Sequence, residues 1–272
     1  MKTNLTKRDV VVLAACIVFV FANLGAIGNG GRKRAKAMLC LSNLHQWGEY
    51  FQAYLEDNDG YFFKGLQFNG PPEGHWYWDL LPYYGHNPDL RLCPEATKLI
   101  AGGNGSWHDP HSAWGKFGIR PLDNQSWGTR WVDGFYGSYG INPWVNDQAP
   151  GIENDVPVGA KGYWRTVNVK GVNRIPVFFG CLWYQIWPGP FPDDDPPATE
   201  YASGMGMRQA CLDRHNGAVN MLFMDFSARK VGLKEPWTLK WHQVFDTEGE
   251  WTTAGGVQPE DWPEWMRKYK DY

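Results

Sequence analysis

The 272-residue chain lacks the short motifs that mark most enzyme and cofactor sites. It has no Cys-x-x-Cys pair and no local group of His and Cys, which argues against a zinc site. A Gly-x-Ser-x-Gly nucleophile motif, a glycine-rich phosphate loop and a conspicuous pair of carboxylates are absent as well. We therefore expect neither an enzyme nor a bound cofactor.

An excess of basic charge is also missing from most of the chain. The sequence holds 26 basic and 29 acidic residues, and seven of the basic ones lie within residues 1–40 beside a single acidic one. The remainder is acidic overall and offers no basic patch for nucleic acid. We expect no nucleic-acid partner.

Long apolar runs are absent but for one, residues 10–27, which are 18 residues without a charge. That length is about the minimum for a helix that crosses the hydrocarbon core of a bilayer. A basic cluster follows at residues 32–36, so we expect residues 1–34 to form a single-pass membrane anchor with a basic flank. A cleaved signal peptide is the alternative, although residues 26–28 (Ala-Ile-Gly) depart from the usual Ala-x-Ala cleavage pattern.

An amphipathic helix is predicted directly after the basic cluster, over residues 37–55. Apolar side chains recur there at three- and four-residue spacing, while polar ones occupy the opposite face. Residues 57–60, Asp-Asn-Asp-Gly, form a turn that ends the helix. The soluble domain, residues 35–272, has to cover the apolar face, which consists of Ala37, Cys40, Leu41, Leu44, Trp47, Gly48, Phe51, Tyr54 and Leu55.

The rest of the soluble domain divides into three parts by composition. Residues 61–150 form a Trp-rich insertion, in which Trp76 and Trp78 are spaced as on one face of a strand. Residues 162–233 hold the β-branched and aromatic runs of a small antiparallel sheet, and residues 234–272 form an aromatic tail that we expect to pack on the domain. The predicted strands are residues 162–169, 175–183, 205–212, 218–225 and 226–233, with a hairpin turn at Asn216-Gly217.

The tryptophans allow two interpretations. Their rings fill a loop-rich core with the polar edges near the surface, or they line a surface that stacks on polysaccharide. We expect the core, and we keep a membrane-anchored envelope protein with a carbohydrate-binding surface as the alternative function.

Five short motifs follow one another along the chain. This order, with the acidic Asp9 at the head of the apolar run, resembles type IV pilins and type II secretion pseudopilins. The last motif resembles the His-x9-Asp-Gly signature of a pseudopilin-like group abundant in planctomycete-type bacteria. The motifs are Ala37 with Cys40-Leu41-Ser42-Asn43-Leu44, then Tyr54-Leu55-Glu56-Asp57-Asn58-Asp59-Gly60, Leu92-Cys93-Pro94, Ser138-Tyr139-Gly140-Ile141-Asn142, and Arg214-His215-Asn216-Gly217 leading to Asp225.

The resemblance implies a pilin-like α+β fold, with a long N-terminal helix packed on a small antiparallel β-sheet. It also implies a structural subunit of a type II secretion or type IV pilus-like assembly. Its partners would be other pilin-like subunits, secretion components of the inner membrane, and membrane lipid. The protein would cross the inner membrane once, with its N-terminus in the cytoplasm and its soluble domain periplasmic or extracellular. The signature residues are Cys40, Asn43, Cys93, Pro94, Tyr139, Asn142, His215, Asn216, Gly217 and Asp225.

Two positions depart from the family pattern. The prepilin cleavage site usually follows a Gly, and here the cut would fall between Asn4 and Leu5, with Asp9 as the acidic fifth residue. Because Asn4 replaces that Gly, we expect cleavage and N-methylation to be slow or absent. Asp225 is followed by Phe226 instead of Gly, so we expect no turn with positive φ there.

Two groups of polar residues are candidate sites. His215 and Asp225 invite a catalytic interpretation, but no nucleophile motif accompanies them. We therefore expect His215 to order the hairpin by hydrogen bonds to the backbone or to Asp225. The acidic loop of Asp193, Asp194 and Asp195 offers oxygen ligands for calcium, although we expect it to be solvated.

The cysteines outside the apolar run form an even set. A domain outside the cytoplasm permits disulfides. Cys40 lies on the buried helix face and Cys93 precedes a Pro in a predicted loop at the sheet edge, while Cys181 and Cys211 end or follow predicted strands. We expect Cys40 to lie near Cys93 and Cys181 near Cys211, as two candidate disulfides.

Overall fold

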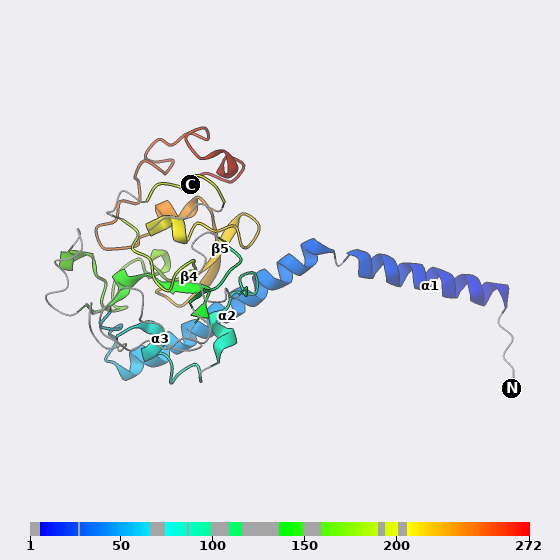
Figure 1. The fold of residues 1–272 in the computed structure, drawn as a ribbon, viewed down its shortest axis with the longest axis horizontal. Coiled ribbons are helices and arrows are strands. Elements are labelled where there is room, and N and C mark those ends of the chain that lie inside the picture. Colours follow the sequence, from blue (N-terminus) through cyan, green and yellow to red (C-terminus); the bar gives the residue numbers. More distant parts are fainter. Residues whose placement is uncertain are drawn as a thin grey trace.

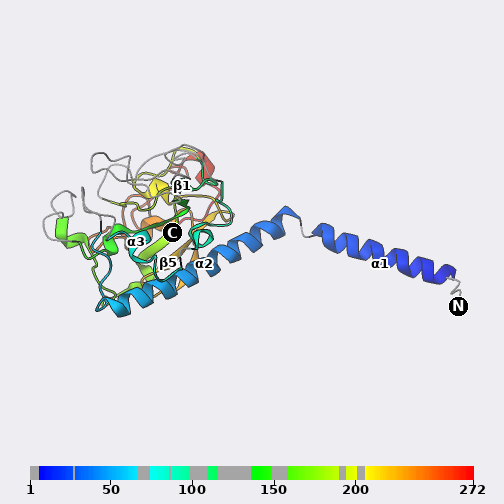
Figure 2. The same ribbon diagram turned by 60° about the horizontal axis from the view of Figure 1, so that its bottom comes forward.

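Two helices form the N-terminal part of the protein, for which we have a computed structural model. α1 spans Lys7–Ala26 and α2 spans Asn29–Asp57. Gly28 between them has an extended backbone (φ −66°, ψ −176°), so the predicted single long helix is interrupted. α1 points away from the globular part in both views (Figures 1 and 2). The structure describes residues 6–26, 28–65, 74–85, 87–98, 109–115, 136–148, 159–189, 194–200 and 206–272.

The apolar run predicted to cross the membrane coincides with α1. Within the described part of the chain, no helix is both long enough and apolar enough to span a bilayer. Asn4, Leu5 and the side chains of Asp9 and residues 18–26 lie outside the described residues. The membrane anchor stays a prediction.

The apolar face predicted on α2 is confirmed. Cys40 is its first buried residue among the described side chains, and buried positions continue at helical spacing to Leu55. A Cβ on Gly48 would lie 3.2 Å from Leu222 Cδ1 and 3.3 Å from the carbonyl oxygen of Phe226, so α2 lies very close to the sheet. The helix ends as expected, because Gly60 N donates to the carbonyl oxygen of Leu55 at 2.8 Å.

The predicted small antiparallel sheet is present and makes the protein α+β. Its four strands lie in the order β3 (Tyr139–Ile141), β4 (Pro176–Gly180), β5 (Ala218–Phe223) and β6 (Ala228–Gly232). A separate pair is formed by β1 (Trp114–Gly115) and β2 (Tyr136–Gly137). The short helices are α3 (Trp76–Asp79), η1 (Pro88–Arg91), η2 (Pro143–Val145), η4 (Gly159–Gly162), η5 (Val172–Arg174), η6 (Gly206–Gln209), η7 (Glu235–Thr238) and η8 (Glu264–Met266).

Each face of the sheet is covered by a different part of the chain. Neighbouring strand residues point to opposite faces, so Phe178 and Leu222 join the core beneath α2 while Phe179 and Met221 join a second core. The second core contains the buried side chains of the C-terminal tail, which lies across β4 and β5 from α2 (Figures 1 and 2). The prediction that the tail packs on the domain is confirmed.

Three predicted strands are wrong. Residues 162–169 contain the end of η4 and a single bridge between Thr166 and Tyr61, and the described part of 205–212 holds η6 and irregular chain. Trp76 and Trp78 lie on the helical turn α3, not on a strand. Trp76 and Tyr77 are adjacent and both buried.

None of the described tryptophans is exposed. Their rings pack edge to face, as in Trp47 and Trp76, whose centroids lie 5.5 Å apart at 87°. The core interpretation is confirmed for these residues, while Trp107, Trp127 and Trp131 lie outside the described ones. The tryptophans with almost no exposed surface are Trp47, Trp76, Trp114, Trp144, Trp241 and Trp262.

His242 gives the packing of the tail a pH dependence. Its ring is buried 4.9 Å from the Trp144 ring and 5.3 Å from the Phe245 ring, and among the described residues its Nδ1 has no hydrogen-bond partner. Burial lowers the pKa of His242 from 6.5 to about 4. Between these values the unfolded chain binds a proton that the folded chain does not. The stability that the neutral ring contributes is complete above the higher value and is lost as pH falls towards the lower one.

We expect the free energy of unfolding to fall by about 2–3 kcal/mol more in the wild-type protein than in His242→Phe between about pH 7 and about pH 4. Urea denaturation of the full chain in detergent, followed by circular dichroism at several pH values, measures this difference. His45→Gln, which changes an exposed histidine on α2, should keep the wild-type slope. Equal slopes for the wild type and His242→Phe would contradict the assignment.

Candidate functional site

Three of the sequence motifs contribute one side chain each to a buried cluster. Cys40 comes from α2, Cys93 from the loop after η1, and His215 from the turn before β5. Their sulfur and ring nitrogen atoms all lie within 4.8 Å of one another, and none of the three residues is more than 4% exposed. The fold thus gathers three metal-ligating side chains that the sequence keeps far apart.

Residues of a fourth motif hold the two thiols in place. Tyr139 Oη donates to Cys40 Sγ at 3.2 Å, and Cys93 N donates to Ser138 Oγ at 2.6 Å. Cys93 Sγ in turn lies 3.3 Å from His215 Nε2. The resemblance to pilins named Tyr139 as a signature residue without a role, and the structure gives it one.

The surroundings shift the pKa values of the Cys40 and Cys93 thiols in opposite directions. Burial by itself raises the pKa of Cys40, but hydrogen bonds from Cys93, Tyr139 and Asn220 outweigh it, and with the charge of Arg214 they leave the pKa of Cys40 below its ordinary value. Burial, followed by the hydrogen bond with Cys40, raises the pKa of Cys93 well above its ordinary value. The surroundings therefore favour the thiolate form at Cys40 and disfavour it at Cys93.

Arg214 joins three separate segments next to the cluster. Its side chain is buried and donates from Nε to the carbonyl oxygen of Pro110 at 2.5 Å, from Nη1 to that of Ser138 at 2.6 Å, and from Nη2 to that of Cys181 at 3.1 Å. Since these are backbone oxygens, the guanidinium ties the turn at Pro110 to the chain between β2 and β3 and to the end of β4, and it supplies a positive charge beside the thiols.

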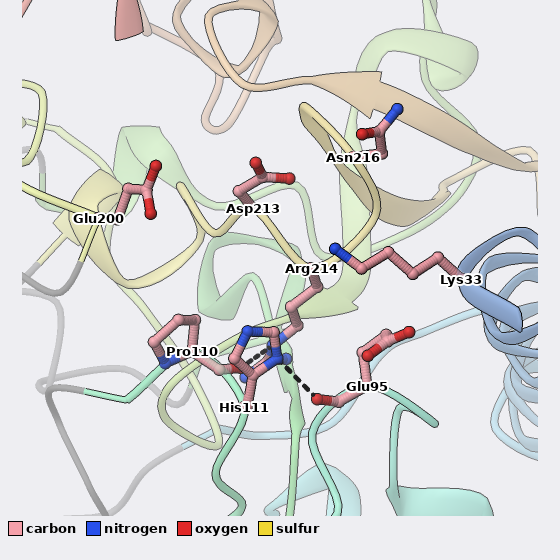
Figure 3. Close-up of a pocket in the computed structure, with 8 residues that line it drawn as sticks. All are labelled: Lys33, Glu95, Pro110, His111, Glu200, Asp213, Arg214 and Asn216. Carbon is pink, nitrogen blue, oxygen red and sulfur yellow. Dashed lines mark hydrogen bonds between the residues drawn. The ribbon is translucent and has the colours of Figure 1, made fainter. Parts of the chain in front are cut away.

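A small polar pocket of about 180 Å³ lies beside Arg214 (Figure 3). Lys33 extends from α2 towards the segment with Arg214 and Asn216, and His111 Nδ1 lies 2.9 Å from the carbonyl oxygen of Glu95. Because both positively and negatively charged side chains line the pocket, its charge favours neither an anionic nor a cationic ligand. The lining residues are Lys33, Glu95, Pro110, His111, Glu200, Asp213, Arg214 and Asn216.

Two signature asparagines have structural roles. Asn43 Nδ2 donates to the carbonyl oxygen of Leu92 at 3.3 Å, which ties α2 to the loop that carries Cys93. Asn142 is fully buried, and its Nδ2 donates to the carbonyl oxygens of Pro176 at 2.9 Å and Trp241 at 2.8 Å. The second asparagine therefore connects β4 to the tail.

The remaining signature residues form turns. Pro94 lies in a turn closed by the hydrogen bond from Ala96 N to the carbonyl oxygen of Cys93 at 2.8 Å. Asn216 and Gly217 have φ values of 56° and 80°, as an Asn-Gly turn requires. This turn leads into β5 from an irregular segment, so the predicted hairpin of two strands is absent around it.

Of the two expected partners of His215, the backbone or Asp225, the second is wrong. Asp225 is exposed in the β5–β6 turn, where its Oδ1 accepts from Ser227 N at 3.0 Å. Phe226 has a φ of 61°, so the positive-φ turn that we expected to be absent is present without glycine. The hairpin closes through the bond from Phe223 N to the carbonyl oxygen of Ser227 at 2.9 Å, which forces this conformation on Phe226.

Neither candidate disulfide is formed, since all five cysteines are free thiols. Cys40 and Cys93 are nevertheless close, as expected, but His215 joins them. Cys181 and Cys211 belong to adjoining segments, because Leu182 N donates to the carbonyl oxygen of Gln209 at 3.0 Å. Their thiols bond elsewhere: Cys211 Sγ donates to the carbonyl oxygen of Leu233 at 3.5 Å, and Cys181 Sγ accepts from Trp183 N at 3.4 Å.

The carboxylates of Asp194 and Asp195 in the acidic loop make contacts within the protein. Asp194 Oδ1 accepts from Met207 N at 3.2 Å and its Oδ2 accepts from Gly189 N. Asp195 Oδ2 lies 3.6 Å from Arg208 Nη2. These contacts use oxygens that calcium would need, and Asp193 lies outside the described residues.

No protein family, no curated protein and no solved structure matches this chain.

We expect Arg214→Met to destabilise the globular part by about 3–5 kcal/mol, because it leaves the buried carbonyl oxygens of Pro110 and Cys181 without a donor and removes one of the two donors to Ser138. The same substitution at Arg34, which is exposed on α2, should change the free energy of unfolding by less than about 0.5 kcal/mol. Urea denaturation of both variants in detergent makes the comparison. A loss below about 1 kcal/mol for Arg214→Met would contradict the role given to this residue.

Proposed function

We propose that the protein is a pilin-like structural subunit, held in the bacterial inner membrane by α1 and assembled with other subunits of its kind. The observation that carries the proposal is the uncovered apolar surface of α1. Val10, Val11, Val12, Leu13 and Ile17 are 48–67% exposed, and no described part of the chain packs on them. Water is a poor solvent for such a surface, so lipid or other helices have to cover it.

The distribution of these residues favours lipid or a helix bundle over a single docking groove. Residues 10–13 follow one another directly, and successive residues of a helix point about 100° apart. The apolar side chains therefore surround the helix instead of forming one stripe. A helix that is apolar all round belongs in a membrane or in the interior of a bundle.

The continuation of the exposed apolar surface onto α2 supports contacts between subunits. Met38 and Leu39 are 66% and 57% exposed, although they lie beside Cys40 at the start of the buried face. They point away from the sheet, where a neighbouring helix would cover them. The globular part then remains outside the helical bundle. This is the arrangement expected of the pilins whose motifs this sequence resembles.

Asp9 at the start of α1 fits this assembly if the chain is processed. A carboxylate inside an apolar bundle needs a positive partner. Cleavage between Asn4 and Leu5 would provide one, as the new N-terminal amine of a neighbouring subunit. Without cleavage the protein is a solitary anchored protein of the envelope, and mass spectrometry of its mature N-terminus distinguishes the two forms.

The alternative, a carbohydrate-binding surface, has less support. Stacking on sugars needs an exposed aromatic platform, and every described tryptophan is buried or half-buried. Trp107, Trp127 and Trp131 lie outside the described residues, and binding to immobilised polysaccharide tests them directly.

We expect Ile17→Arg to release the protein from the membrane fraction. Ile17 lies in the middle of α1, and an arginine at the centre of a membrane helix costs about 2.5–3.5 kcal/mol, or about a hundredfold in partition. Val244→Arg changes a residue of the tail with a 60% exposed side chain and should leave the fractionation unchanged. Equal release of both variants, or of neither, would contradict the anchoring role of α1.

Assembly is tested through Cys16, which is exposed on α1 while the other four cysteines are buried. Oxidative cross-linking of membranes should yield a covalent dimer of the wild-type protein and none of Cys16→Ser. A wild-type protein that stays in the membrane without forming dimers would show that α1 anchors the chain without packing on other copies.

A further inference from the structure

We propose that Cys40, Cys93 and His215 bind a zinc ion inside the globular part and thereby join α2 to two loops of the domain. The inference does not depend on the proposed assembly, because the three ligands belong to one chain. It reverses the expectation drawn from the absence of a local Cys or His motif. Zinc sites are usually visible as closely spaced ligand pairs, and here each ligand comes from a different segment.

The distances fit a tetrahedral site. Zn–S bonds of about 2.3 Å and a Zn–N bond of about 2.0–2.1 Å separate sulfur from nitrogen by about 3.6 Å and the two sulfurs by about 3.8 Å. Cys93 Sγ and His215 Nε2 lie 3.3 Å apart, and all three ligand atoms lie within 4.8 Å of one another. An ion between them requires these separations to change by no more than about 1 Å.

The chemistry of the ligands selects a thiophilic ion. Two thiolates and one imidazole suit zinc, whereas calcium and magnesium require oxygen ligands. The two thiolates balance the charge of Zn²⁺, so the filled site is neutral apart from Arg214, which three carbonyl oxygens hold. Three protein ligands leave one position, which a water molecule occupies in zinc sites of this kind.

The His215 ring is otherwise incompletely bonded. Its Nε2 faces Cys93, and its Nδ1 has no hydrogen-bond partner in the described part of the protein, although the residue is only 4% exposed. A buried polar group without a partner costs about 1–3 kcal/mol. A metal bond at Nε2 leaves Nδ1 unpaired, but its binding free energy offsets the cost of burying the ring between two cysteines.

The position of the cluster gives the ion a mechanical role. Cys40 is the first buried residue of α2 among the described side chains, so the ion lies where the helix enters the domain. It would connect this point to the loop at Cys93 and to the turn before β5. Because the ion binds only the folded chain, its affinity adds to the stability of the globular part.

The test is the metal content of the full chain, purified in detergent from cells supplied with zinc and then desalted. We expect about one zinc per chain by elemental mass spectrometry, and a loss of more than about tenfold in Cys40→Ser and in Cys93→Ser. Cys211→Ser is the matched control, because it makes the same change at a buried cysteine outside the cluster and should keep the zinc. Equal loss in all three variants, or none in any, would overturn the proposal.

A second measurement covers the case in which the variants fail to fold. Cobalt added to the metal-stripped wild-type protein should give the visible absorption of tetrahedral Co²⁺ with thiolate ligands, and zinc should displace it. Chelation should also lower the melting temperature of the wild-type protein. A folded wild-type protein that takes up neither metal, or that carries a disulfide between Cys40 and Cys93 by peptide mass spectrometry, would refute the site.

Discussion

The contact between α2 and the sheet is the constraint on which the rest of the structure depends. A sheet of four short strands cannot shield its own faces, and α2 covers one of them with a row of large side chains. Trp47 stands at the centre of this row, with its ring 5.0 Å from that of Phe178 on β4 and 5.5 Å from that of Trp76 on α3. Its indole N–H also donates to the carbonyl oxygen of Leu90 at 2.7 Å. One side chain thus joins the helix, the sheet and the Trp-rich insertion.

What the sequence predicted correctly depends on short-range periodicity. The apolar face of α2 is encoded by residues three and four positions apart, and the hairpin of β5 and β6 by two neighbouring runs. Both patterns are local, so they are visible without knowledge of the fold. Trp76 and Tyr77 could not be assigned in this way, because an aromatic run of four residues fits a strand and a helical turn equally well. In the folded protein these residues pack into the core as the helical turn α3.

The sequence indicated the separate motifs of the candidate site, but it did not indicate that all three of its residues lie together. The motifs containing Cys40, Cys93 and His215 were all recognised, and the burial of Cys40 together with the loop at Cys93 correctly placed those two residues near each other. The hairpin spacing of ten residues suggested the backbone or Asp225 as the partner of His215. Its actual neighbour, Cys93, lies 122 residues away in the sequence, and only the pairing of distant segments brings the two together. Residue spacing therefore argued against zinc, although the fold brings together three side chains that are able to bind it.

The arrangement along α2 links the two proposals physically. α2 begins beyond the break at Gly28, runs past the exposed Met38 and Leu39, and becomes buried at Cys40. Any force that a neighbouring subunit or the membrane applies to the N-terminal helices reaches the domain through this first buried turn. A core packed only by dispersion resists such a load weakly at its edge, where few side chains surround the helix. Metal–thiolate bonds at the same position would anchor the helix to two loops, so the edge of the core would become its strongest attachment.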